Sequence, residues 1–325
     1  MKKILFSWSL LALCGGLLVA CQNVPLTGRS QLAIMPQSMI MSQSATALGD
    51  FLKKAKVIHD TPEARQVERV GRRIQHAVER YMAEQQLSDQ LKDYDWSFTL
   101  VEDDKTPNAF CLPGGQIVVY TGILPLTRDD EGLGAVLGHE VAHAIAQHGS
   151  ERMSQNVLVS VAGAAVAAGL SASAAKQSKT LSAYDKGKIE LMSAAFGAAA
   201  TFGVLMPYSR LHESEADRMG MYFMAMAGYN PEQAVALWQR FKEEIHKEKG
   251  QTPEFFSTHP SDDTRIGQNQ ETLAEVMPIY RQNLSKRKAD EAGLGLGGAV
   301  DEEQGAKSKA RSKRSGEKMR VPVAP

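Results

Sequence analysis

The chain carries the sequence HEVAH at residues 139–143, within a stretch whose apolar residues recur at helical spacing. Residues four apart lie on one face of a helix, so His139 and His143 can reach a single zinc ion. Glu140 is then close enough to take a proton from a water on that ion. Because so short a motif arises by chance in roughly 1 in 100 chains of this length, it predicts a zinc site but does not by itself predict an enzyme.

The sequence also predicts the two ends of the helix that carries this motif. Thr127, with Asp130 three residues later, is typical of a capping box at the start of a helix. Gly149 is expected to end it. The side of this helix that should be buried carries Leu133, Val136, Leu137, Val141 and Ala144.

The rest of the body contains more predicted helix than predicted strand. Thr61-Pro62-Glu63 combines an N-cap, a proline at the first helical position and an acid in the first turn, so a long helix should begin there. Further helices are expected from Asn230 and near Ser261, and strands at residues 96–101 and 116–120. This pattern indicates an α+β fold, mainly helical, with a small β-sheet.

The first twenty residues read as a signal peptide. Two lysines precede an apolar run at residues 4–19, and the run ends in Leu18-Val19-Ala20-Cys21, which resembles a bacterial lipobox. In that resemblance, cleavage leaves Cys21 as a lipid-carrying N-terminus. Gln22, where a retention aspartate could stand, favours the outer membrane with the protein facing the periplasm. The alternatives are an uncleaved anchor or an ordinary signal peptide with a chance cysteine.

Cysteine content and charge exclude two classes of protein. With Cys14 removed and Cys21 acylated, Cys111 remains alone, so a disulfide framework within the chain is excluded and the pairing of Cys111 with a partner stays open. The 37 basic and 37 acidic residues give no overall field for nucleic acid. Residues 286–325 are charged and lack apolar periodicity, which predicts a disordered tail that is solvated or touches lipid headgroups or peptidoglycan.

Residues 157–206 are rich in alanine and glycine, with lysines between two apolar pieces. Small residues contribute little to membrane insertion, so a closely packed soluble helical hairpin is expected rather than a membrane hairpin. Since the segment separates the two stretches with candidate ligands, it could act as a lid over the site.

A catalytic zinc site needs three protein ligands and one open position. His148 falls one residue short of the third histidine of the extended motif, so we expect it to be structural. Glu213 and Asp217 are four residues apart on a predicted helix and share one face. Glu213 could complete a His₂Glu site while Asp217 orients a ligand imidazole; alternatively, both belong to a solvated acidic face.

Taken together, these motifs resemble the M48 family of zinc metallopeptidases, and within it the Oma1-like bacterial lipoproteins. The resemblance rests on HEVAH with QHGSERMS at residues 147–154 and on Glu213 with Asp217. It extends to residues 23–32, to AGYNP at 227–231, and to STHP at 257–260 followed by Arg265. It implies a zincin-like metalloprotease domain over residues 61–285, preceded by a lipid-anchored segment at 21–60.

The resemblance also assigns roles. One Zn²⁺ per chain would be held by His139, His143 and Glu213, with Glu140 as the base and Asp217 supporting a ligand histidine. His259 would lie near the open position and stabilise the oxyanion, unless it is simply structural. Arg265 would help hold the site together. The substrate-facing edge, where an extended peptide could add as a strand, would comprise Asn108, Ala109, Phe110, Gly114 and Gly115; composition alone reads this segment as a hairpin.

The function implied is a zinc-dependent endopeptidase that degrades misfolded or misassembled cell-envelope proteins. Its partners would be those substrates, the membrane through the lipid anchor and the outer-membrane assembly machinery, but no nucleic acid. One alternative is a periplasmic chaperone or assembly factor on the same fold, with latent proteolysis; another is a different zinc hydrolase. A full ligand set together with Glu140 favours the protease, because a scaffold has no need of a base.

Overall fold

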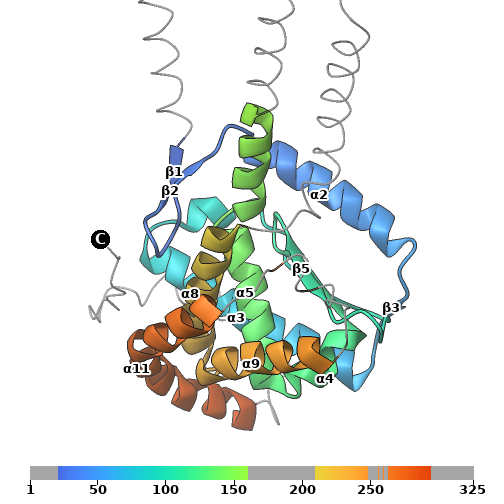
Figure 1. The fold of residues 1–325 in the computed structure, drawn as a ribbon, viewed down its shortest axis with the longest axis vertical. Coiled ribbons are helices and arrows are strands. Elements are labelled where there is room, and N and C mark those ends of the chain that lie inside the picture. Colours follow the sequence, from blue (N-terminus) through green and yellow to red (C-terminus); the bar gives the residue numbers. More distant parts are fainter. Residues whose placement is uncertain (1–20, 160–208, 248–254, 256–258, 260–262, 294–325) are drawn as a thin grey trace, which may run out of the picture.

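The computed structural model describes residues 21–159, 209–247, 255, 259 and 263–293 (Figure 1). The predicted signal peptide, nearly all of the predicted hairpin or lid at 157–206, and residues 294–325 of the predicted tail lie outside these residues. The described elements are β1 (Cys21–Asn23), β2 (Ser30–Leu32), α2 (Gln37–Leu52), β3 (Val57–Ile58), α3 (Pro62–Glu84), η1 (Ser88–Leu91), β4 (Ser97–Val101), β5 (Ala109–Leu112), β6 (Gln116–Tyr120), η2 (Thr121–Ile123), α4 (Leu124–Thr127), α5 (Asp130–Ile145), α8 (Arg210–Ala227), α9 (Glu232–Lys247) and α11 (Asp263–Gly293).

A four-stranded sheet forms one layer of the fold, with strand order β3-β4-β6-β5. Strands β4 and β6 are parallel, and the other two pairings are antiparallel. One face of the sheet packs with α3, α5 and α8 in the main core, and the other is covered by α2 through Leu48 and Phe51. The predicted strands and the predicted α+β class, mainly helical with a small sheet, are confirmed. Strand β5 is the last strand on one side, which leaves one of its edges unpaired within the sheet.

The N-terminal ends of the long helices follow from their capping residues. Thr61 caps α3 as predicted, accepting a hydrogen bond from the Ala64 amide at 3.1 Å. The predicted capping box at Thr127 is wrong. Arg128 has φ +70°, which ends α4 and turns the chain, so Asp129 becomes the N-cap of α5 and accepts from the Gly132 amide at 2.9 Å.

The predicted end of α5 at Gly149 is also wrong. Gln147 adopts a left-handed conformation with φ +54°, and this ends α5 at Ile145. A new helix then covers residues 148–159, and Gly149 lies in its first turn. This break redirects the chain directly after the HEVAH motif and places His148 beside it.

Helices α5 and α8 cross in close contact, which positions the site (Figure 1). A Cβ atom added to Gly220 would lie 2.9 Å from the backbone nitrogen of His139, and one added to Gly138 would lie 2.9 Å from the Gly220 carbonyl oxygen. Backbone atoms cannot yield as a flexible side chain can, so both positions require glycine. The crossing brings the first turns of α8 next to the HEVAH motif.

Helix α11 packs along α8 and continues to Gly293, so residues 286–293 are helical and the predicted disordered tail cannot begin at 286. The helix continues because Arg287 is anchored: its guanidinium lies 4.3 Å from the centre of the Tyr229 ring, and it pairs with Glu131. Among the described helices, none is both long enough and apolar enough to cross a membrane.

Candidate metal centre

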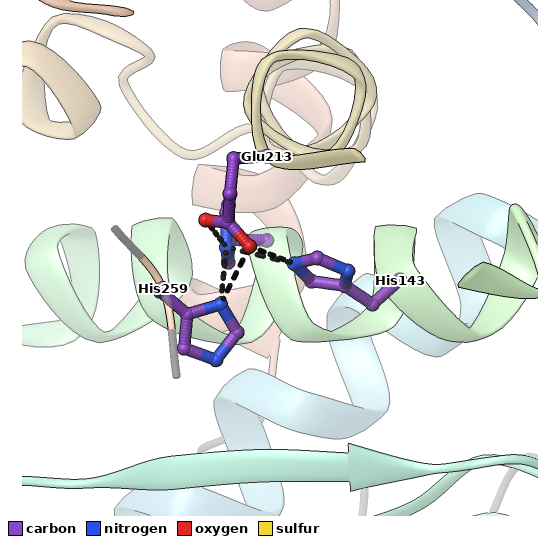
Figure 2. Close-up of side chains that lie close together, drawn as sticks. His143, Glu213 and His259 are labelled. Carbon is purple, nitrogen blue, oxygen red and sulfur yellow. Dashed lines mark hydrogen bonds and ion pairs between the residues drawn. The ribbon is translucent and has the colours of Figure 1, made fainter. Parts of the chain in front are cut away.

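Four buried side chains from three parts of the chain converge on one point (Figure 2). His139 and His143 project from α5, Glu213 from the first turn of α8, and His259 from the segment that precedes α11. One potential ligand atom from each lies within 4.8 Å of all the others. Figure 2 shows the Glu213 carboxylate reaching between the imidazoles of His143 and His259. Spacing predicted His139 and His143, and the family resemblance added Glu213; the structure adds His259 to the cluster itself.

The distances between these atoms fit a tetrahedral metal ion. Nε2 of His139 lies 3.1 Å from Nε2 of His143 and 3.2 Å from Nδ1 of His259. The Glu213 carboxylate lies 3.1 Å from His259 Nδ1, 3.4 Å from His143 Nε2 and 3.5 Å from His139 Nε2. A tetrahedral ion with bonds of 2.0–2.1 Å would separate its ligand atoms by about 3.4 Å. The chemistry of the donors, imidazole nitrogens and one carboxylate, suits the same kind of ion.

The electrostatics of the cluster also favour a cation. Buried charges are costly unless they are compensated. Here the buried carboxylates of Glu140, Glu213 and Asp217 accompany one buried guanidinium, that of Arg265. Burial alone would lower the pKa of His139, but hydrogen bonds to Asp217 and Glu213 raise it to about 9. The environment therefore stabilises positive charge at His139, whereas burial lowers the pKa of His143 well below its usual range.

Asp217 and Arg265 contact two side chains of the cluster, His139 and Glu213, and hold them in place. Asp217 Oδ1 lies 2.9 Å from Nδ1 of His139, which directs Nε2 of that ring toward the other ligand atoms. Arg265 donates to both oxygens of Asp217 at 2.8 Å, and its Nη1 lies 2.9 Å from Glu213 Oε2. The Trp238 ring covers the guanidinium at 4.3 Å. The structure thus brings both predicted supporting residues into contact with ligand side chains.

Glu140 lies between the cluster and β5. Its Oε2 accepts a hydrogen bond from the backbone N–H of Cys111 at 3.1 Å. Its Oε1 accepts none from the residues the structure describes, and Nε2 of His259 lies 3.4 Å from it. Burial raises the pKa of Glu140 above its usual range, which brings it closer to that of a base working near neutral pH.

The predicted substrate-facing residues are divided between two places. The amide of Tyr120 donates to the carbonyl of Asn108 at 3.0 Å, so the backbone groups of Ala109 and Cys111 alternate away from β6 toward Glu140. The N–H of Ala109 on this edge donates to Oδ1 of Asn108 at 2.9 Å, which leaves its carbonyl facing away from β6. The side chain of Phe110 packs on Phe51 of α2.

Gly114 and Gly115 lie in the β5–β6 turn, not on the unpaired edge of β5. Their φ values are +102° and +83°, in the region that favours glycine, and a Cβ on Gly115 would meet the Trp96 ring at 2.6 Å. The hairpin suggested by composition is thus present, and its first strand is an outer strand of the sheet; that a peptide binds along it stays a prediction.

Two features of the site were not found from the sequence. Cys111 contributes its backbone amide, and its buried thiol donates to the Leu112 carbonyl at 3.5 Å. Strand alternation with Ala109 could have indicated this. Trp238 on α9 also lies against His139, with ring centres 5.5 Å apart. No sequence spacing connects a tryptophan on α9 with a histidine on α5.

Residues 68–273 match peptidase family M48. The chain belongs to this family of metallopeptidases. It is 36% identical over 186 residues to the mitochondrial metalloendopeptidase OMA1 of Schizosaccharomyces pombe, covering 57% of this chain and 49% of the relative. It is 30% identical over 198 residues to the Saccharomyces cerevisiae protein of the same name, covering 58% and 50%. The chain thus spans about half the length of these curated relatives.

A bacterial relative carries a different name. The beta-barrel assembly-enhancing protease of Yersinia pestis is 24% identical over 187 residues, covering 56% of this chain and 35% of the relative. The family membership agrees with the predicted zincin-like metalloprotease domain and with a metal-dependent site at the four-residue cluster.

Proposed function

We propose that this M48 chain is a zinc-dependent endopeptidase that hydrolyses peptide bonds in misfolded or misassembled proteins of the cell envelope. The observation that carries the proposal is the position of Glu140. Its carboxylate lies between the cluster of potential metal ligands and the outward-facing amide of Cys111 on an unpaired strand edge. A base, a metal site and a surface for an extended peptide therefore meet at one place.

His139, His143 and Glu213 would hold the zinc ion. A zinc ion bound there would polarise the carbonyl of the scissile bond and could lower the pKa of a water from ~15.7 to about 7. The donor set of two imidazoles and one carboxylate is the one that leaves a coordination position for this chemistry.

The residues of the chain perform the remaining steps. Glu140 Oε1 accepts a proton from the water that adds to the carbonyl carbon, and Glu140 returns this proton to the amine as the C–N bond breaks. The β5 edge holds the peptide by main-chain hydrogen bonds, which are independent of side-chain identity. This mode of binding suits unfolded segments, because a folded protein offers few extended strands with unpaired backbone groups.

His259 could have either of two roles in this mechanism, as a metal ligand or as a hydrogen-bond donor. As described, its Nδ1 completes a set of four protein groups, and a set of four ligands is typical of a closed zinc site. If His139, His143 and Glu213 alone held the ion, as proposed, the His259 imidazole would stand beside the site. From beside the cluster it can then donate a hydrogen bond to the developing oxyanion, the role that the sequence predicts.

The proposed location is the periplasmic face of the outer membrane, with Cys21 lipidated. Support comes from the lipobox-like sequence that ends at Cys21. Labelling with radioactive palmitate and membrane fractionation would test this, with Cys21→Ser as the control. Incorporation of label into the Cys21→Ser protein would refute lipidation at this site.

A second candidate function is a chaperone or assembly factor for outer-membrane proteins. The name of the Yersinia pestis relative refers both to assembly and to proteolysis, and this is the reason for considering the second function. A strain lacking the gene, complemented with the wild type or with Glu140→Gln, separates the two. We expect misassembled outer-membrane proteins to be cleared by the wild type only. Equal clearance with Glu140→Gln would favour the assembly factor.

A further inference from the structure

A polar network outside the metal cluster contains residues of the N-terminal segment. Arg29, in the loop between β1 and β2, lies between the carboxylates of Glu151 and Glu215. Its Nε donates to Glu215 Oε2 at 2.8 Å, while Nη1 and Nη2 donate to the two oxygens of Glu151 at 3.0 and 2.7 Å. Thr27 in the same loop donates its hydroxyl to Glu215 Oε1 at 2.5 Å. One short loop thus holds two carboxylates from distant parts of the sequence.

Each of these carboxylates also binds one imidazole. Glu151 lies 3.0 Å from Nε2 of His212, and Glu215 lies 2.9 Å from Nε2 of His148. The two rings are stacked with their centres 4.5 Å apart. The His148 branch continues to the metal cluster, because Nδ1 of His148 lies 2.9 Å from Nδ1 of His143. The network therefore has two similar branches, and one of them contacts a candidate zinc ligand.

The direction of the hydrogen bonds along this branch follows from the chemistry of imidazole. A neutral imidazole carries one N–H, and the nitrogen that binds a metal must be the one without it. His143 presents Nε2 to the cluster, so its proton is on Nδ1 and is donated to Nδ1 of His148. His148 must then carry its own proton on Nε2 and donate it to Glu215.

We propose that Thr27 and Arg29 act as positioning residues for His143, through Glu215 and His148. The Glu215 carboxylate is the acceptor at the end of the chain of hydrogen bonds, and the two N-terminal residues hold it in place. The proposal rests on the metal site of the proposed function. It makes the loop that follows Cys21 a part of the active-site scaffold, in addition to connecting the domain to its N-terminus.

The substitution Glu215→Gln tests the proposal, because the amide can donate to His148 Nε2. His148 would then carry its proton on Nδ1, where it opposes the Nδ1–H of His143. We expect the zinc affinity of the full chain, measured by competition with a chromophoric chelator, to fall about 10–100-fold. In ¹⁵N-histidine NMR spectra of the zinc-loaded protein, the Nδ1–H signal of His148 should replace its Nε2–H signal.

The control is Glu151→Gln, on the branch that ends at His212. Glu151 matches Glu215 in burial, with side-chain exposures of 7% and 5%, and in its contacts with Arg29 and one imidazole. Both substitutions should lower the melting temperature. Only Glu215→Gln should change zinc affinity by more than about threefold.

A second pair of variants tests the N-terminal end of the network. Thr27→Val removes one hydrogen bond to Glu215 at almost constant volume and should weaken zinc binding by at least about threefold. Ser30→Ala, which removes an exposed hydrogen bond to Asn23, should leave it unchanged.

Equal losses of zinc affinity in Glu215→Gln and Glu151→Gln would overturn the proposal, since they would indicate a merely structural network. An unchanged zinc affinity in Thr27→Val would show that the N-terminal segment does not help to position His143. A wild-type chain that binds no zinc would refute the proposed function itself, so the two failures are distinguishable.

Discussion

At the scale of single residues, Asp217 is expected to set the affinity of the site through His139. Its carboxylate fixes the imidazole by the 2.9 Å contact at Nδ1. Asp217→Asn should weaken zinc binding about 10–100-fold, because an amide is a poorer acceptor than a carboxylate and carries no charge to pair with Arg265. Chelator competition measures this effect. Asp50→Asn, at an exposed ion pair with Lys53, is the control; equal affinities in the two variants would contradict the role of Asp217.

Glu151 should make stability depend on pH in the acid range. Burial opposes its ionisation, but His212 and Arg29 lower its pKa to about 2 from 4.5. Between pH 2 and pH 4.5 the Glu151 carboxyl is protonated in the unfolded chain but ionised in the folded chain. Its contribution to the free energy of unfolding is therefore complete above pH 4.5 and is lost as the pH falls toward 2. At 1.36 kcal/mol per pKa unit, reduced by solvent screening around the partly exposed Arg29, it amounts to about 1–3 kcal/mol.

Denaturant unfolding of wild type and Glu151→Gln between pH 7 and pH 2 checks this prediction. The difference in unfolding free energy should be largest at neutral pH and shrink on acidification. A difference that stays constant over this range would mean that the carboxylate is not stabilised by its charge.

The sequence predicts residues at this scale where their spacing carries the information. Four-residue spacing on a helix identifies His139 with His143, and Glu213 with Asp217. It cannot reveal Arg29 as a partner of Glu215, because 186 positions separate the two and neither belongs to a motif of known chemistry. The cap at Asp129 was missed because it depends on the left-handed conformation of Arg128, a residue that rarely adopts it.

At the scale of elements, the site depends on how closely α5 and α8 cross. Gly220→Ala places a methyl group against the backbone of α5 at His139. The two helices should separate, with a loss of about 1–3 kcal/mol in stability and weaker zinc binding, since the ligands come from both helices. Gly49→Ala on α2, where nothing lies within 4 Å, should be neutral or stabilising. Equal stability of the two variants would show that the crossing is not tight.

The existence of these helices, and the faces they bury, could be predicted from periodicity. Their crossing could not, because a glycine in a helix has no distinctive signature in one sequence. Likewise, composition suggested a hairpin at β5 and β6, but only the strand order shows that β5 is the outermost strand and faces Glu140.

At the scale of the whole molecule, a bound metal should join α5, α8 and the segment that holds His259. Zinc at 1,000 times its dissociation constant should stabilise the fold by about 4 kcal/mol, and a chelator should remove this gain. Differential scanning calorimetry with and without chelator measures the shift. Glu140→Gln should retain it, and Glu213→Gln should lose most of it. A shift that survives Glu213→Gln would place the metal elsewhere.

The most direct test of the account combines metal content with cleavage of casein, an unfolded substrate, by the wild type and Glu140→Gln. We predict one zinc ion per chain in both proteins. Cleavage by the wild type should be abolished by a chelator and restored by zinc, and Glu140→Gln should cleave about 10²–10⁴ times more slowly. Casein cleavage at the wild-type rate by zinc-loaded Glu140→Gln would contradict the assignment of Glu140 as the base, and with it the proposed mechanism.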